Sequence, residues 1–189
     1  MNIVAIGDSI TSGQYLPPEC AWPQQLARLT GAKVLNAGVA NETTRQGLER
    51  FPRHVQEVRP DALVIQFGLN DCNRWKSDRG LPRVSRSAYA ANLREMVTRA
   101  FAFDIATVVI CGLTPTQKSD QHKRDRLEYD ATAQTVANVM PVEFFPSPTD
   151  LWHHLIDDLH LSEEGHRIYA EGVAACLNIS FPTAKSAAA

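Results

Sequence analysis

Two short polar segments, far apart in the sequence, contain the residue types needed for nucleophilic catalysis. Ser9 lies in Gly7-Asp8-Ser9-Ile10, directly after an apolar run. A serine hydroxyl is a weak nucleophile and needs a base. The segment Asp157-Asp158-Leu159-His160 offers an imidazole, and a carboxylate three residues earlier can reach its Nδ1 while Nε2 faces outward. Because such a carboxylate fixes the tautomer and stabilises the imidazolium, the two segments predict a triad of Ser9, His160 and Asp157.

Each segment also has a purely structural interpretation. Aspartate and serine are favoured in turns, so Gly7–Ile10 could simply connect a strand to a helix. Asp157 and His160 could form a surface ion pair before a helix. Asp158 fits a solvated neighbour or a cap better than an orienting group. Only the combination of several such elements favours catalysis.

Two further residues, Gly38 and Asn70, could donate hydrogen bonds to an oxyanion. Asn70 carries a side-chain amide, and a chain can approach closely at the Gly38 backbone N–H. With the Ser9 N–H they would form a three-donor oxyanion hole, in which one donor is typically worth about 10²–10³ in rate. Gly38 could instead serve a turn with positive φ, and Asn70 could stabilise a turn through its side chain.

Short apolar runs alternate with helical segments, which predicts a parallel sheet with crossover helices. The expected strands are 3–6, 33–36, 62–67, 107–111 and 142–145, and the expected helices are 22–29, 44–58, 87–103, 121–139 and 162–177. Pro52 should break or kink the second helix. The pattern favours a flavodoxin-like α/β/α fold with strand order 2-1-3-4-5. In that order, strand one lies between strands two and three, so Ser9, Gly38 and Asn70 should meet at the topological switch point.

Four sequence blocks resemble those of the GDSL, or SGNH, hydrolase superfamily. They are Gly7-Asp8-Ser9-Ile10, with Ile10 where the family name has leucine, and then Asn36-Ala37-Gly38, Gly68-Leu69-Asn70-Asp71 and Asp157 to His160. Their order and spacing match over Gly7 to His160. The resemblance implies the SGNH hydrolase fold, a triad of Ser9, Asp157 and His160, and an oxyanion hole formed by Ser9, Gly38 and Asn70. It implies no metal and no organic cofactor.

The resemblance implies a mechanism more sharply than a substrate. The expected function is hydrolysis of acyl esters through an acyl-enzyme, with short acyl groups on a small polar or carbohydrate alcohol. Alternatives are an acyltransferase acting on a sugar hydroxyl, a lysophospholipase or a thioesterase. A non-catalytic binding module fits poorly, because it would not need all five residues.

The segment after Asn70, Cys72 to Arg86, should line the mouth of the site. Trp75 could stack on a sugar ring or cover an acyl chain. Four cations of this segment could meet an anionic group on the substrate: Arg74, Lys76, Arg79 and Arg83. The competing interpretation is a solvated loop in which Trp75 packs partly against the domain. Substrate binding is expected of Trp75, Arg74 and Arg79.

Composition and cysteine spacing exclude several classes of partner and site. A formal net charge of -2 and a pI near 6.3 argue against a nucleic-acid partner. The four cysteines form no C-x-x-C pair, so the sequence suggests neither a zinc site nor a disulfide framework. No apolar stretch has the roughly 20 residues of a membrane helix. No secretory signal is visible, because Asn2 leads straight into the apolar run 3–6, so the chain is expected to be cytoplasmic. Its expected partner is a small acyl ester, without stable membrane insertion, and its oligomeric state stays open.

The domain organisation is expected to be simple. Residues 1–181 should form one domain, and residues 182–189, which lack a core-facing pattern, should form a disordered tail.

Overall fold

The computed structural model describes residues 1–178, so the expected tail at 182–189 lies outside the described residues. Five parallel strands form one sheet in the order β2-β1-β3-β4-β5. They are β1 (Asn2–Gly7), β2 (Lys33–Gly38), β3 (Ala62–Gln66), β4 (Thr107–Cys111) and β5 (Glu143–Phe145). This arrangement confirms the expected flavodoxin-like sheet.

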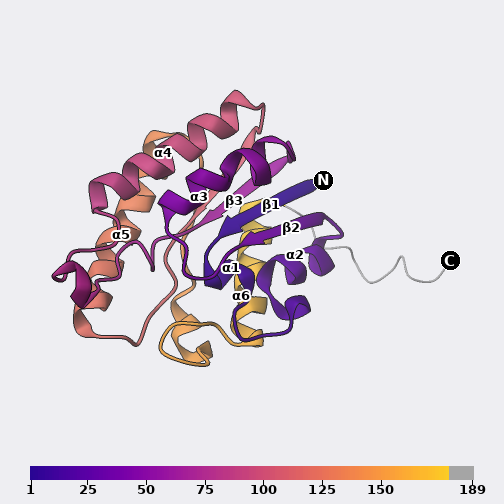
Figure 1. Cartoon of the computed structure of the whole chain (residues 1–189). Coiled ribbons are helices and arrows are strands. Elements are labelled where there is room, and N and C mark those ends of the chain that lie inside the picture. Colours follow the sequence, from indigo (N-terminus) through magenta and orange to yellow (C-terminus); the bar gives the residue numbers. More distant parts are fainter. Residues whose placement is uncertain (179–189) are drawn as a thin grey trace.

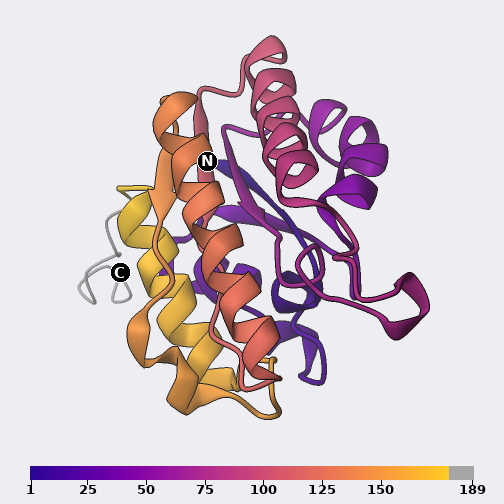
Figure 2. The ribbon, with the colours of Figure 1, turned by 90° about the vertical axis from the view of Figure 1, so that its left-hand side faces the viewer.

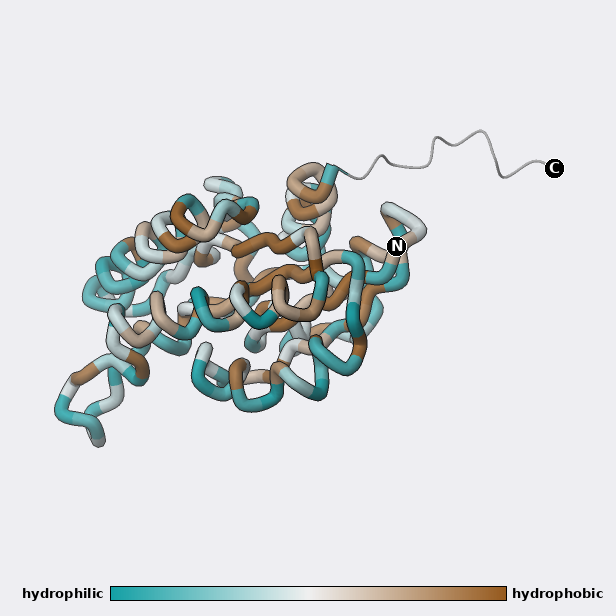
Figure 3. Tube along the Cα trace, turned by 90° about the horizontal axis from the view of Figure 1, so that it is seen from above, coloured by the Kyte–Doolittle hydropathy of each residue, from teal (hydrophilic) through white to brown (hydrophobic). Residues whose placement is uncertain are grey.

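Position in the sheet explains the composition of the strands. β3 is buried along its whole length, and β1 is exposed only at Asn2, because helices cover both faces of the central strands. β2 lies at the edge, and its residues alternate between exposed and partly buried over most of its length. In Figure 3 the most hydrophobic stretches of the chain accordingly lie in the middle of the molecule.

Helices cover the sheet on both sides (Figure 1). They are α1 (Ser9–Ser12), α2 (Trp22–Thr30), α3 (Thr44–Phe51), α4 (Arg86–Ala102), α5 (Asp120–Val139) and α6 (Glu163–Cys176). α2 packs beside α6, whereas α3 packs beside α4 and α4 beside α5. Figure 2 shows the long helices running side by side and the segment between β3 and α4 projecting from the body. No helix among residues 1–178 is long and apolar enough to span a membrane.

Pro52 has the effect that the sequence predicts. α3 ends at Phe51, and the chain continues from Pro52 to Gln56 as one wider π-helical turn. Proline lacks the N–H that would extend the α-helical ladder, so regular α-helix stops at this point. Val55 in the wider turn is still buried in the core.

Two short elements at the edge of the site were not expected from the sequence. α1 is a single turn, and a 3₁₀ turn at Lys76–Asp78 lies within the projecting segment. One helical turn is too short for a hydrophobic period to be recognisable. Ser9 is the first residue of α1, and Trp75 directly precedes the 3₁₀ turn.

Candidate active site

Ser9 is the first residue of α1 and follows β1 after a single residue, Asp8. The Asp8 carboxylate caps the helix by accepting the Ile10 N–H at 3.0 Å, and Gly13 ends the turn in the left-handed conformation. As the first helical residue, Ser9 has a backbone N–H without an acceptor inside the helix. Its side chain is almost fully buried, with the residue 4% exposed. The local structure thus holds the hydroxyl in place and leaves an N–H beside it.

The structure brings His160 and Asp157 to Ser9 from the other end of the chain. His160 Nε2 lies 3.1 Å from Ser9 Oγ, and His160 Nδ1 lies 2.7 Å from Asp157 Oδ2. The other oxygen of Asp157 accepts the backbone N–H groups of Leu159 and His160, at 2.7 and 2.6 Å. The carboxylate therefore shapes the turn and orients the ring at the same time.

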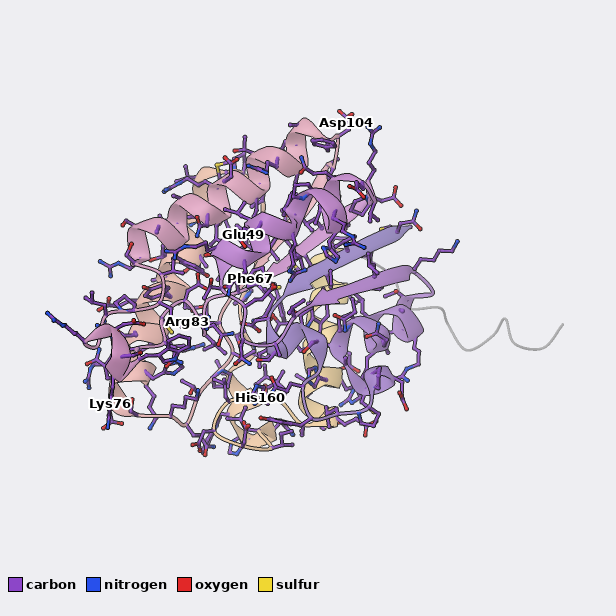
Figure 4. The ribbon with its side chains drawn as sticks, in the orientation of Figure 1. Glu49, Phe67, Lys76, Arg83, Asp104 and His160 are labelled. Atoms are coloured by element: carbon purple, nitrogen blue, oxygen red, sulfur yellow. The ribbon has the colours of Figure 1, made fainter. Side chains whose placement is uncertain are left out.

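The surroundings of this pair favour the ionised form of the Asp157 carboxylate and hold the His160 ring in one orientation. Desolvation alone would raise the pKa of Asp157, but the hydrogen bonds from His160 and Leu159 outweigh it and lower that pKa below its usual value. Tyr15 packs edge-on against the His160 ring, with ring centroids 5.0 Å apart. His160 is labelled in Figure 4.

Asn70 lies in the turn after β3. Its Nδ2 donates to the Glu42 carbonyl at 3.0 Å and lies 3.4 Å from Asp8 Oδ2. Glu42 in turn is held by Arg50, which also donates to the Gly7 carbonyl at 3.0 Å. These bonds join the ends of β1 and β3 to the loop after β2, so the amide has a fixed orientation.

Gly38 takes a different position from the one expected. Its N–H donates to Asn36 Oδ1 at 2.9 Å, and Gly38 is not among the described residues that line the cavity around Ser9. A Cβ at Gly38 would lie 2.2 Å from the Ser12 backbone nitrogen. The glycine is needed for the close approach of β2 to α1, and its N–H already donates to Asn36, so this structure does not leave that N–H free for an oxyanion.

Asn41, which the sequence analysis did not single out, lies where Gly38 was expected. It lines the cavity with Ser9 and Asn70, and its φ of 66° is in the left-handed region. Its carbonyl accepts a hydrogen bond from Arg83 at 2.9 Å, whereas its N–H has no acceptor among the described residues. Asparagine tolerates this conformation better than most residues. An asparagine three residues after a glycine was the available signal, and it is a weak one.

Asp71, next to Asn70, fixes the start of α3. It is fully buried and accepts hydrogen bonds from the backbone N–H and the hydroxyl of Thr44. Burial raises the pKa of Asp71 to about 6 and the pKa of Asp8 to about 7, from an ordinary value of 3.8. Two carboxyl groups that ionise reluctantly thus lie beside Ser9 and Asn70.

The Ser9 hydroxyl opens into a cavity of about 400 Å³. Besides the residues described above, its walls are formed by Gln14, Tyr15, Asn73, Trp75, Arg83, Lys118, Asp158 and Leu159. Polar side chains dominate this lining, with Tyr15, Trp75 and Leu159 as the main apolar surfaces.

Of the substrate-binding residues expected from the sequence, Trp75 lines this cavity. Arg74 and Arg79 are not among the described residues that form its walls. Arg74 makes two hydrogen bonds to Asp125, at 2.6 and 2.9 Å, and one to the Gly80 carbonyl. Its charge is therefore neutralised by a carboxylate of α5. Arg83, which no expectation distinguished from the other cations of this segment, reaches the cavity instead.

The histidines near the C-terminal end do not gather into a metal site. Within residues 1–178 no group of three or more histidine, cysteine, aspartate or glutamate side chains is placed to hold a metal ion. His166 is buried, and its Nδ1 accepts the Trp22 N–H at 3.2 Å. Burial lowers the pKa of His166 to about 4, so the ring is neutral and joins α6 to α2.

Comparison with known proteins identifies the relatives of this arrangement. The sequence profile of the GDSL-like Lipase/Acylhydrolase family matches residues 5–168. An arylesterase of Vibrio mimicus is 30% identical over 102 residues, which are 51% of this chain and 47% of that protein. The thioesterase 1/protease 1/lysophospholipase L1 of Escherichia coli is 27% identical over 51% of this chain and 49% of its own length. The chain thus spans about half the length of these relatives.

Solved structures extend the likeness in fold to nearly the whole chain. A catalytic mutant of an acetylxylan esterase from Geobacillus stearothermophilus superposes with a TM-score of 0.78 at 20% identity, covering 95% of this chain and 94% of that one. A lipase/acylhydrolase from Enterococcus faecalis gives a TM-score of 0.78 at 21% identity, with 97% and 99% covered. At these identities the likeness shows the fold.

Burial of Asp8 makes stability depend on pH in a predictable direction. Asp8 has a pKa of 3.8 in the unfolded chain and about 7 in the folded protein. Between these two pH values Asp8 is therefore protonated in the folded state and ionised in the unfolded state. The free energy of unfolding should therefore fall as the pH rises from about 4 to about 7, by up to about 1.4 kcal/mol per pH unit from this group. Asp8→Asn keeps an acceptor for the Ile10 N–H and removes the titration. Urea unfolding at pH 5, 6, 7 and 8 should show the variant gaining stability relative to the native protein as the pH rises. Parallel pH profiles for the two proteins would refute this assignment.

Proposed function

This chain belongs to the GDSL-like lipase/acylhydrolase family, and we propose that it is a carboxylic ester hydrolase that acts through an acyl-enzyme on Ser9. The observation that carries the proposal is the unbroken chain of short contacts from Asp157 to His160 to Ser9, at 2.7 and 3.1 Å. Nδ1 is held by the carboxylate, so Nε2 is left to take the proton from the hydroxyl.

The reaction proceeds in two halves. Ser9 Oγ attacks the ester carbonyl while His160 Nε2 takes the hydroxyl proton, and the imidazolium then gives that proton to the departing alcohol. Water, activated by the same imidazole, attacks the acyl-enzyme and releases the acid and free Ser9. Asp157 remains ionised throughout and stabilises the imidazolium, a role that its lowered pKa supports.

The tetrahedral oxyanion is stabilised by donors from three loops. We assign them to the Ser9 N–H at the start of α1, the Asn70 amide and the Asn41 N–H. The Ser9 and Asn41 N–H groups are supported by two facts: both residues line the cavity, and neither N–H has an acceptor within the described chain. Asn70 is supported by the bond to Glu42, which holds its amide at the cavity wall.

The substrate is proposed to be a short acyl ester of a small polar or carbohydrate alcohol. The cavity of about 400 Å³ is walled chiefly by amide and charged side chains, which suit hydroxyl groups better than an alkyl chain. Trp75 is 46% exposed at its mouth and offers a flat surface for a sugar ring. The acetylxylan esterase with the same fold, although only 20% identical, is in keeping with this class of substrate.

Replacing the nucleophile tests the mechanism directly. Ser9→Ala should lower kcat/KM for p-nitrophenyl acetate by about 10⁴-fold or more, because the attacking oxygen is gone. Ser87→Ala, at an exposed position of α4, is the matched control and should leave the rate unchanged. In the native protein acetate should react faster than butyrate and octanoate. Equal turnover by native protein and Ser9→Ala would refute the assignment.

The pH profile tests the base. The rate constant kcat/KM for p-nitrophenyl acetate should fall as the pH is lowered through the range in which imidazoles protonate, since protonated His160 cannot accept the Ser9 proton. Asp8 titrates in a similar range, so Asp8→Asn should be measured in parallel and should keep the same acid limb. A rate that stays constant from about pH 5 to about pH 8 would exclude His160 as the base.

Substitutions at Asn41 separate its backbone from its side chain. Asn41→Gly keeps the N–H and suits the left-handed conformation, so kcat/KM should stay within a few-fold of the native value. Asn41→Val places a β-branched residue at φ 66° and should displace the N–H, lowering kcat/KM by about 10-fold or more. Thermal unfolding of both variants shows whether the valine also destabilises the fold. An Asn41→Gly protein as impaired as Asn41→Val would assign the role to the side chain instead.

A further inference from the structure

Arg83 is one of nine arginines of the described chain that have no carboxylate oxygen within 4.0 Å, and among all fourteen it is the one that lines the Ser9 cavity. Five others have a carboxylate oxygen within 4.0 Å: Arg50, Arg74, Arg86, Arg99 and Arg167. Arg83 has none at that distance among residues 1–178. Its Nη1 donates to the Asn41 carbonyl at 2.9 Å, and its guanidinium lies over the Trp75 ring, 4.5 Å from the centroid. The cation is thus held in place without being neutralised by direct contact.

The surroundings of Arg83 leave hydrogen-bonding capacity unused. Desolvation lowers the pKa of Arg83, although Asp71 and Asp78 act in the opposite direction from a distance. A guanidinium has five N–H donors, and only one of those in Arg83 has an acceptor among the described residues. A partly desolvated cation with free donors is suited to an anionic ligand, because it has already lost part of its hydration.

Arg83 and Trp75 form the boundary between two cavities. Both line the cavity that contains Ser9 and His160, and both line a neighbouring cavity of about 440 Å³. The second cavity is otherwise lined by Thr43, Arg45, Gln46, Glu49 and Asp78. In Figure 4 Arg83 is labelled above His160 and Lys76, and Lys76 lies at the margin of the molecule. A ligand at Ser9 can therefore extend to the guanidinium.

Some of the charged side chains that line the Ser9 cavity have a partner of opposite charge within the described chain, and others do not. Lys118 also lines it and has no carboxylate within 4.0 Å in the described part of the chain. Of the two carboxylates in the lining, Asp157 is bound to His160, whereas Asp158 is exposed and adjoins Asp157. An anionic group would thus be repelled from Asp158 and attracted to Arg83.

We propose that this site takes an ester bearing a carboxylate or similar anionic group, which the Arg83 guanidinium binds while stacked on Trp75 and which Lys118 attracts. The inference rests on the proposed ester hydrolysis and adds a substrate class to it. Two parallel N–H···O bonds from a guanidinium to a carboxylate provide direction as well as charge. The anionic group would anchor the substrate at a fixed distance from Ser9.

Two pairs of esters test the proposal. The first pair, p-acetoxybenzoate and its methyl ester, differs by one charge on the alcohol side, and the second, p-nitrophenyl hemisuccinate and p-nitrophenyl butyrate, differs by one charge on the acyl side. For each pair the ratio of kcat/KM, charged over neutral, is compared between native protein and variants. Arg83→Gln should lower this ratio by about 10-fold or more for at least one pair, and that pair identifies the side that carries the anion.

Lys76→Gln is the matched control. It removes one positive charge from the same segment at a residue outside the cavity lining, so both ratios should stay within about two-fold of the native values. Arg83→Lys keeps the charge without the planar fork and should give an intermediate ratio. In native protein the ratio for the affected pair should also fall with added salt. Ratios that Arg83→Gln leaves unchanged for both pairs would overturn the proposal.

Failure of the proposed function gives a different result. If native protein hydrolyses none of the four esters, the ester hydrolysis fails, and binding becomes the measurement. Calorimetric titration of p-acetoxybenzoate and of p-nitrophenyl hemisuccinate into Ser9→Ala should give, for at least one of the two, an affinity about 10-fold or more above that of Ser9→Ala/Arg83→Gln. Equal affinities of the two variants for both anions would reject the anion site on its own. If Arg83→Gln does not fold, the Arg83→Lys ratio and the salt dependence in native protein decide the question.

Discussion

The pairing of β1 with β2 on one side and β3 on the other is the constraint on which the site depends. All three strands run parallel, so their carboxyl ends meet at one edge of the sheet. The strands β1, β2 and β3 end at Gly7, Gly38 and Gln66. The three segments that follow these strand ends run in different directions. A crevice opens at such a switch point, and side chains from three distant segments enter it. His160 reaches the same point from the segment before α6, 151 residues after Ser9 in the sequence.

Buried polar groups convert this proximity into a fixed geometry. Asp8 caps α1 and contacts the Asn70 amide, and Asp71 binds the start of α3 through Thr44. Burying such carboxyl groups opposes their ionisation, which the raised pKa values of Asp8 and Asp71 reflect. The fold tolerates this because each carboxyl accepts hydrogen bonds from the backbone it positions. These buried groups hold the site in a fixed geometry. Because their pKa values are raised, they lower the free energy of unfolding as the pH rises toward the values at which they ionise.

The sequence predicts this architecture well wherever the signal is local. β-branched and apolar runs identify the strands, since strands covered on both faces admit little else. The contact of Asp157 with His160 follows from a spacing of three residues. Gly38 and Asn41 show where local reasoning ends, because a glycine serves close packing as readily as anion binding. Which of two neighbouring peptides faces the cavity depends on how β2 approaches Ser12, and that is a tertiary contact.

The sequence also does not show which cations are paired with a carboxylate in the folded protein. Arg74, Arg79 and Arg83 are alike in the sequence, and only their partners distinguish them. Asp125, 51 residues after Arg74, neutralises that arginine, whereas Arg83 receives an aromatic face and a backbone carbonyl. That carbonyl belongs to Asn41, a residue that lines the cavity with Ser9. One short segment after β2 thus contacts Arg83 and also lines the cavity that contains Ser9. The Arg83 bond fixes the peptide plane that follows the Asn41 Cα, whereas the N–H belongs to the preceding plane, two soft dihedral angles away, so its direction also depends on the left-handed φ of 66°.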